Sequence, residues 1–151
     1  MQDEENIVSI LPISKELVDE VTEKCLKIKL EEGEKRPPSG YFLLFATKLG
    51  LIKKTDLHEY VRINRNGKYA LRFKLENDSL VNVQQSVDSD DVVMISTTGY
   101  ASRFKCDAIR TSGRVSGGVY GIKVADRKGS GGGFVAGMLA MSEADSQILT
   151  I

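Results

Sequence analysis

The sequence predicts a mostly β fold of two four-stranded, propeller-like blades with one inserted α-helix. Its 14 glycines and absence of tryptophan accompany many short β-rich runs. The same order of strands occurs twice, and strand openings fall at Leu43, Val92 and Ile148, 49 and 56 residues apart. Four strands in a period of roughly 50 residues is typical of propeller-like blades. Two blades cannot close a ring, so we expect residues 1–151 to be a fragment of one longer domain.

The N-terminal segment precedes the first blade. Residues 1–13 contain the apolar run Ile7–Leu11, which we interpret as the end strand of a preceding blade. Residues 14–39 break the β pattern and are expected to form a helical insert. Ser14 is a suitable N-cap for a helix from about 15 to 29, whose apolar stripe has helical spacing. Its role is expected to be structural, with partner binding as the alternative.

The first blade is expected over residues 40–88. Its opening strand is a continuous apolar run, as expected of a strand covered on both faces, and Gly50 is placed for a hairpin turn. The third strand alternates between apolar and basic residues, which indicates a half-buried strand. The four expected strands are Phe42–Thr47, Leu51–Thr55, Tyr69–Leu75 and Leu80–Val83.

The second blade is expected over residues 89–146, with a glycine turn at Gly99. A further opening strand is expected to begin in residues 147–151. The four expected strands of this blade are Val92–Thr98, Tyr100–Phe104, Ser116–Val124 and Phe134–Met138.

Charge and composition narrow the functional classes. The chain has 21 Lys+Arg and 21 Asp+Glu, but the balance is −4 over residues 1–47, +6 over 48–128 and −2 over 129–151. A basic centre between acidic ends favours a polyanion-binding surface, with chance clustering on a solvated face as the alternative. No apolar run reaches the ~20 residues of a membrane span, and the acidic start is unlike a signal peptide. Two cysteines allow no disulfide framework, which predicts a reducing cytosol.

Basic residues recur at similar places in the two blades. Some lie just past the glycine turns, and others lie in the long loop that follows. A curved row of cations suits a duplex backbone, whose phosphates are evenly spaced and carry no sequence code; the alternative is that these residues keep β edges soluble. The candidate DNA-binding residues are Lys53, Lys54, Arg62, Arg65, Lys68, Arg103, Lys105, Arg110 and Arg114.

Other polar motifs are interpreted as structural. Asp88–Asp91 resembles a Mg²⁺-binding carboxylate pair, but it directly precedes a strand, where a turn is expected. Lys128–Gly133 lacks the ending of a phosphate-binding loop and is expected to be a hairpin tip. His58 is the only histidine and is expected to end a loop. We therefore predict no catalytic residue and no metal site.

The doubled order of apolar strand, glycine turn and basic return strand resembles the C-terminal domains of the A subunits of DNA gyrase and of topoisomerase IV. The resemblance rests on Phe45–Thr55, Val92–Phe104 and Gly117–Val124. It implies a β-pinwheel whose basic rim wraps duplex DNA and so supports negative supercoiling. The family's glycine-basic box, Gln-Arg-Arg-Gly-Gly-Lys-Gly, is not matched; the nearest segments are Ile63–Lys68 and Ser112–Gly118.

The resemblance also defines the expected context. It implies a non-catalytic DNA-binding part of a bacterial type II topoisomerase, acting in the cytoplasm on double-stranded DNA without sequence specificity. Its partners would be a second copy of the gyrase A protein and the gyrase B protein. ATP and magnesium would be bound elsewhere in the enzyme, and no cofactor is expected in this chain. The alternatives are a topoisomerase IV-type domain, or a propeller-like protein-interaction scaffold without DNA affinity.

Overall fold

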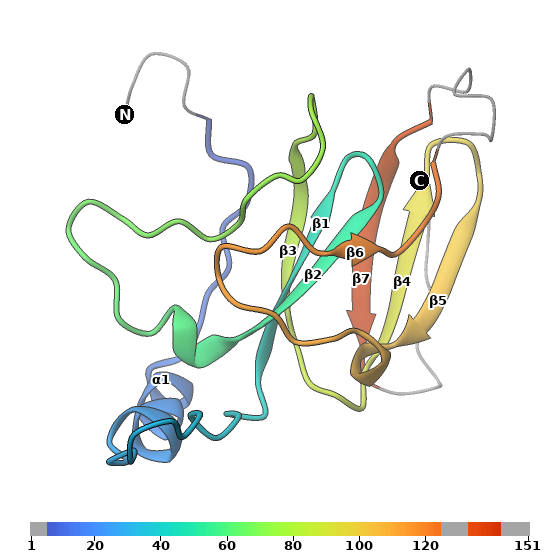
Figure 1. Ribbon diagram of the computed structural model, residues 1–151. Helices are drawn as coiled ribbons and strands as arrows, with labels where there is room; N and C mark the ends of the chain where they lie inside the picture. The colour runs from blue at the N-terminus through green and yellow to red at the C-terminus, as the bar shows by residue number, and fades with distance from the viewer. Residues whose placement is uncertain (1–5, 125–132, 143–151) are drawn as a thin grey trace.

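Two antiparallel sheets lie side by side in the computed structural model, which describes residues 6–124 and 133–142 (Figure 1). The first sheet has the order β3-β1-β2-β6 and the second the order β5-β4-β7. The elements are α1 (Lys15–Val21), β1 (Phe42–Thr47), β2 (Leu51–Asp56), β3 (Leu80–Ser86), β4 (Asp91–Ser96), β5 (Ala101–Lys105), β6 (Val119–Tyr120) and β7 (Val135–Met141). The predicted mostly β fold with two sheet units is confirmed.

The β1–β2 hairpin forms as the sequence predicts. Gly50 has a φ of 96° in its turn, and β1 pairs with β2 on one side and β3 on the other. Every residue of β1 and of β2 is buried. Complete burial follows from covered faces on both sides of the strands, as the apolar run of β1 indicates.

The fourth strand of the first sheet comes from the second sequence repeat. β6 pairs with the outer edge of β2 through Leu51↔Tyr120 and Ile52↔Val119. The expected strand Tyr69–Leu75 is not a strand; it runs outside the sheet, and Tyr69 is 83% exposed. That prediction was wrong because β6 already occupies the β2 edge, so the two units share a strand across the expected boundary at 88/89.

The second sheet contains three strands within the described residues. β4 pairs with β5 through Val93↔Arg103 and with β7 through Val93↔Leu139. The expected strand Ser116–Val124 shortens to β6 and joins the first sheet instead. The described part of the second blade therefore lacks the predicted fourth strand.

The helical insert is shorter than expected. Ser14 caps α1 by accepting a hydrogen bond from the Leu17 N–H at 3.2 Å, as predicted. The chain continues as a π-helical turn, Thr22–Leu26, and then leaves the helix instead of reaching residue 29. The Thr22 hydroxyl donates to the Val18 carbonyl at 2.8 Å, a bond that competes with regular helical geometry.

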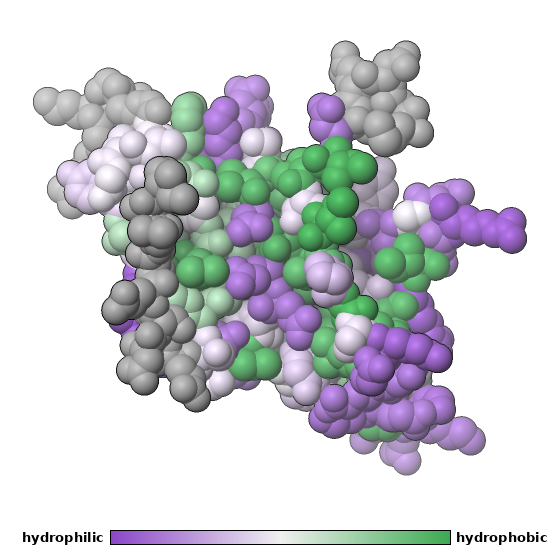
Figure 2. Space-filling view, turned by 180° about the vertical axis from the view of Figure 1, so that it is seen from behind, coloured by the Kyte–Doolittle hydropathy of each residue, from purple (hydrophilic) through white to green (hydrophobic). Residues whose placement is uncertain are grey.

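The N-terminal segment lies along the first sheet without joining it. Residues 6–14 form no strand, so the strand expected at Ile7–Leu11 is absent. Together with Phe45 and Leu80, this segment lines an apolar groove of about 670 Å³, and Figure 2 shows apolar side chains gathered on one face of the molecule. The expected features at 1–5, 128–132 and 147–151 lie outside the described residues.

Two hydrophobic clusters hold the fold. One lies between the sheets and includes Leu44, Ile52 and Met94. The other lies on the opposite face of the first sheet, where Val21 of α1 packs with Phe45. Within 6–124 and 133–142, no helix is long and apolar enough to cross a membrane.

Candidate nucleic-acid interface

The structure separates the nine candidate cations by burial. The exposed ones lie in loops and on the outer strand of the second sheet, while Lys68 and Arg114 are partly buried. Lys53 and Lys54 of β2 are only 1% and 3% exposed. The exposed candidates are Arg62, Arg65, Arg103, Lys105 and Arg110.

The two long loops that follow the hairpins meet. We define the first loop as residues 57–79, after β2, and the second loop as residues 106–118, after β5. Figure 1 shows the second loop (orange) crossing the β1–β2 hairpin before β6. Arg114 Nη1 donates to the Tyr69 carbonyl at 2.6 Å, and the Arg72 N–H donates to the Ser116 carbonyl at 3.5 Å. The two loops therefore adjoin where residues 69–72 meet residues 114–116.

Lys53 is buried beneath both loops. Its ammonium donates to the Ala70 carbonyl of the first loop at 2.7 Å and to the Arg114 carbonyl of the second. The ammonium also lies 5.2 Å from the centre of the Phe45 ring. Burial, and then repulsion from Arg114, lowers the pKa of Lys53 to about 8. The positive charge of Lys53 therefore interacts with the two loop carbonyls and the Phe45 ring.

Lys54 points to the opposite face of β2, toward the second sheet. Its ammonium pairs with Asp88 and donates to the Cys106 carbonyl at 3.2 Å. The ammonium also lies 4.1 Å from the centre of the Phe42 ring. The residue therefore connects the two sheets. DNA contact by Lys53 or Lys54 stays a prediction.

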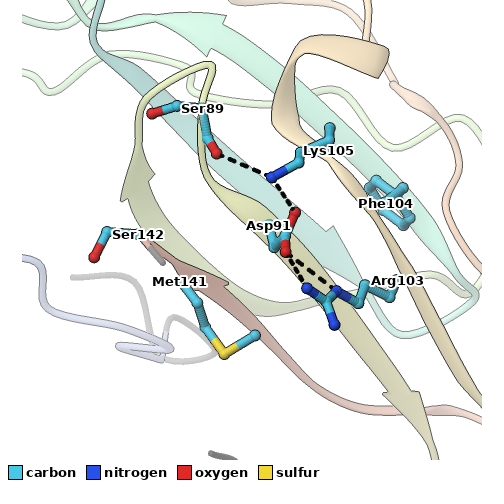
Figure 3. A pocket seen from close by; sticks show the side chains of 7 residues that line it. All are labelled: Ser89, Asp91, Arg103, Phe104, Lys105, Met141 and Ser142. Carbon is cyan, nitrogen blue, oxygen red and sulfur yellow. Dashed lines mark hydrogen bonds and ion pairs between the residues drawn. The ribbon is translucent and has the colours of Figure 1, made fainter. Parts of the chain in front are cut away.

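Arg103 and Lys105 share one acidic partner on β4. Figure 3 shows both side chains directed at Asp91. Arg103 Nε lies 3.2 Å from Asp91 Oδ2, and Lys105 Nζ lies 2.7 Å from Asp91 Oδ1. The hydrogen bonds from Lys105 and then Arg103 lower the pKa of Asp91. Both cations remain about 60% exposed, at 62% and 60%.

Strand pairing shows which cations are structurally equivalent. Phe42 pairs with Asp56 in the first sheet, and Asp91 pairs with Lys105 in the second. Counting along the strands from these pairs, Lys54 matches Arg103 and Lys53 matches Ser102. Of the predicted matches between β2 and β5, a cation recurs only at the Lys54 and Arg103 position, because Lys105 matches Asp56. Lys54 faces the core between the sheets, whereas Arg103 is exposed.

Two cations that the prediction omitted lie in the same region. Arg72 and Lys74 are exposed on the first loop beside Ser116 and Gly117 of the second. Their sequence signal was present, because both fall on the basic side of an alternating run. They complete the exposed basic surface of the first loop together with Arg62 and Arg65.

The Asp88–Asp91 segment and His58, which the sequence analysis interprets as structural, lie in turns. Asp90 Oδ2 accepts from the Ser86 hydroxyl at 2.9 Å and from the Val87 N–H at 3.1 Å, which closes the predicted turn before β4. His58 lies in a short 3₁₀ turn with Nδ1 2.8 Å from Asp56 Oδ1. No group of three or more His, Cys, Asp or Glu residues in the described ranges is arranged to hold a metal ion.

Two curated proteins are similar to this chain in sequence. The chain is 32% identical over 134 residues to the DNA gyrase A protein of Staphylococcus epidermidis, a match covering 88% of the chain and 14% of the relative. It is 37% identical over 112 residues to the DNA gyrase A protein of Mycoplasma genitalium, covering 74% and 12%. The matched part of the chain thus spans about one seventh of the length of these relatives.

Solved structures share the fold. The C-terminal domain of DNA topoisomerase IV superposes with a TM-score of 0.61 at 21% identity, over 69% of this chain and 31% of that one. The DNA gyrase A C-terminal domain superposes with a TM-score of 0.56 at 20% identity, over 75% and 38%. The family model described as "DNA gyrase C-terminal domain, beta-propeller" matches residues 41–86 and 90–130. The chain belongs to this family.

Proposed function

We propose that the chain is a duplex-DNA-binding and wrapping module of a bacterial DNA gyrase A protein, with no catalytic step of its own. Membership of the gyrase C-terminal domain family carries the proposal. The curated relatives favour gyrase, because those with 32% and 37% identity are gyrase A proteins. A topoisomerase IV-type domain is the alternative, since its fold superposes with a TM-score of 0.61 against 0.56 for the gyrase domain.

The arrangement of exposed cations supports an interface with the sugar-phosphate backbone of DNA. On the first and second loops, five exposed cationic side chains donate to no acceptor among the described residues and are available for phosphates: Arg62, Arg65, Arg72, Lys74 and Arg110. They lie on two adjoining loops, and no helix among the described residues is placed to enter a groove. Such a surface binds without reading bases, because phosphate contacts carry no sequence information.

The proposal assigns the remaining chemistry to other parts of the enzyme. Strand cleavage, ATP hydrolysis and magnesium binding would lie outside this chain, and its partners would be the gyrase B protein and a second copy of the A protein. Wrapping would take place with DNA in the bacterial cytoplasm. The small share of each relative that the chain spans is consistent with this division.

Salt dependence of duplex binding tests the interface. About four to six phosphate contacts predict that log affinity falls with log salt at a slope near −4 to −5. The combined variant Arg62→Gln, Arg65→Gln, Arg110→Gln should flatten that slope by about 2.7, since each contact contributes about 0.9. Lys15→Gln, Lys29→Gln, Lys35→Gln is the matched control, because these exposed cations lie in the 14–39 insert.

Wrapping is tested separately from binding. Nicked circular DNA sealed by ligase in the presence of the protein should show a shifted linking-number distribution, and the triple loop variant should lose the shift. If the protein binds DNA but does not shift the linking-number distribution, its function is DNA binding without wrapping. Absence of duplex binding at low salt would refute the proposal and leave the scaffold alternative.

A further inference from the structure

We propose that Lys53 is a positioning residue that joins the two cation-bearing loops and contacts no phosphate itself. The inference rests on the proposed DNA-binding function. It assigns a role to a candidate residue whose burial makes direct contact with DNA unsuitable. It also identifies what sets the spacing between the first and second loops.

The first step is the geometry of the ammonium. Lys53 is 1% exposed, and its Nζ donates to one carbonyl in each loop, those of Ala70 and Arg114. The Phe45 ring lies 5.2 Å from the ammonium. A charged donor forms stronger hydrogen bonds than a neutral one. One side chain from the rigid β2 strand therefore connects both loops.

Neighbouring contacts strengthen the same connection. The Tyr60 hydroxyl donates to the Ala70 carbonyl at 2.9 Å, beside the bond from Lys53. Arg114 Nη1 returns from the second loop to the Tyr69 carbonyl. Carbonyls from adjacent residues of the first loop are thus held from below by β2 and from the side by the second loop. We call Lys53, Tyr60 and Arg114 the loop clamp.

The clamp is specific to the first sequence unit. Its equivalent position in the second unit is Ser102, which has no ammonium to offer. A lysine needed only to complete a strand pattern would recur with the strand. Its presence where two basic loops meet indicates a function tied to those loops.

The groups around Lys53 make the clamp sensitive to pH. Arg114 and Glu59 are the charged groups that act on it, and Tyr60 is the titratable group that shares its carbonyl partner. Burial raises the pKa of Tyr60 to about 12, so Tyr60 stays neutral below that pH. Lys53 loses its proton near pH 8, and because its lowered pKa reflects a preference for the neutral amine in the buried position, the closed clamp becomes more stable above that pH.

A positioning residue and a phosphate ligand differ in a measurable way. Loss of a phosphate ligand flattens the salt slope by about 0.9. Loss of a positioning residue weakens binding at every salt concentration but leaves the slope unchanged. For Lys53→Met we expect at least roughly tenfold weaker duplex binding, because both charge-assisted hydrogen bonds to the loops are lost, with the wild-type slope.

The experiment uses fluorescence anisotropy with a labelled duplex over a salt series at pH 7 and pH 9. Lys53→Met is compared with Lys15→Met, which removes an exposed cation in the insert, and with Tyr60→Phe, which removes one neutral donor of the clamp. If Lys53→Met fails to fold, Tyr60→Phe still tests the clamp. For Tyr60→Phe we expect roughly threefold weaker duplex binding. Between pH 7 and pH 9, wild-type affinity should rise relative to that of Lys53→Met.

Hydrogen–deuterium exchange on the free protein provides a readout independent of DNA. Both variants should accelerate exchange in the first and second loops but leave β1 and β4 protected. A slope flattened by about 0.9 in Lys53→Met would make Lys53 a phosphate ligand and overturn the inference; unchanged exchange would also overturn it. Absence of wild-type binding would instead refute the proposed function, while the exchange result still decides whether the clamp exists.

Discussion

Burial, and then repulsion from Arg114, destabilises the charged form of Lys53, and this makes folding stability depend on pH. The folded-state pKa is about 8, below the ordinary value of 10.5. Between these values the unfolded chain binds more protons, so the contribution of Lys53 to stability rises with pH across that window. We expect urea unfolding at pH 7.5 and pH 10 to show this rise in the wild type and its loss in Lys53→Met. A Lys15→Met control should follow the wild type, and an identical pH trend in Lys53→Met would contradict the prediction.

Asp91 restrains two exposed cations, and its removal should strengthen DNA binding. Asp91→Asn removes one negative charge and releases Arg103 and Lys105 for phosphates. We expect the salt slope to steepen by about 0.9 to 1.8, one or two contacts, measured by anisotropy. Asp107→Asn is the matched control, because this exposed acid lies just past Lys105. Equal effects of the two variants would show that only net charge matters.

Asp91 should also contribute to acid sensitivity. Lys105 and Arg103 hold its folded-state pKa below the ordinary value. The stabilisation is therefore present above the unfolded-state pKa and is lost as the pH falls through the lower, folded-state value. Urea midpoints measured between pH 6 and pH 3 should fall less steeply for Asp91→Asn than for the wild type. A parallel decrease in both proteins would exclude Asp91 as the cause.

The position of each cation could be predicted from sequence, but its burial could not. Neighbouring residues of a strand point to opposite faces, so at most one of Lys53 and Lys54 is expected to be buried in a sheet covered on one side. Both are buried because β2 is covered by loops on one face and by the second sheet on the other. The segments that cover β2 are distant from it in sequence. Local sequence patterns therefore do not predict that both of its faces are covered.

At the scale of elements, the attachment of β6 to β2 depends on close backbone approach. Gly118 has a φ of 81°, and a Cβ there would lie 2.5 Å from the Ile52 carbonyl oxygen. Gly118→Ala combines a left-handed conformation with overpacking, so we expect a loss of about 2–4 kcal/mol in the free energy of unfolding, measured with urea. Gly113→Ala is the control, because nothing lies within 4 Å of its Cβ position. A loss below about 0.5 kcal/mol for Gly118→Ala would show that β6 is not held closely.

The same attachment explains which strands could be predicted. The hairpins β1–β2 and β4–β5 involve neighbouring segments joined by Gly50 and Gly99, so the sequence pattern identifies both strand and partner. Tyr69–Leu75 has equally clear alternation, yet alternation reports an apolar face and not a sheet edge. The edge of β2 pairs with Val119–Tyr120, which is distant in sequence, and no local signal distinguishes the two candidates.

At the scale of the whole molecule, the charge segregation in the sequence becomes a surface that extends over two sequence units. The exposed cations proposed for this interface lie on two adjoining loops and on β5, while Lys53 and Lys54 of β2 are buried beneath them and between the sheets. A straight, stiff duplex contacts such a surface over a limited length. Contact with further cations therefore requires the DNA to bend, at a cost of order 1–6 kcal/mol for 20–30 base pairs.

This cost predicts that flexible DNA binds more tightly than intact DNA. A duplex of about 30 base pairs with a central two-nucleotide gap avoids most of the bending energy, so we expect roughly tenfold tighter binding, equivalent to about 1.4 kcal/mol. A duplex with the same gap near one end is the control, since it contains equal single-stranded DNA but does not relieve bending at the centre. End-to-end energy transfer on the intact duplex should rise on binding because the ends approach each other. Equal affinity for the two gapped duplexes, with unchanged energy transfer, would show that the chain binds DNA without bending it.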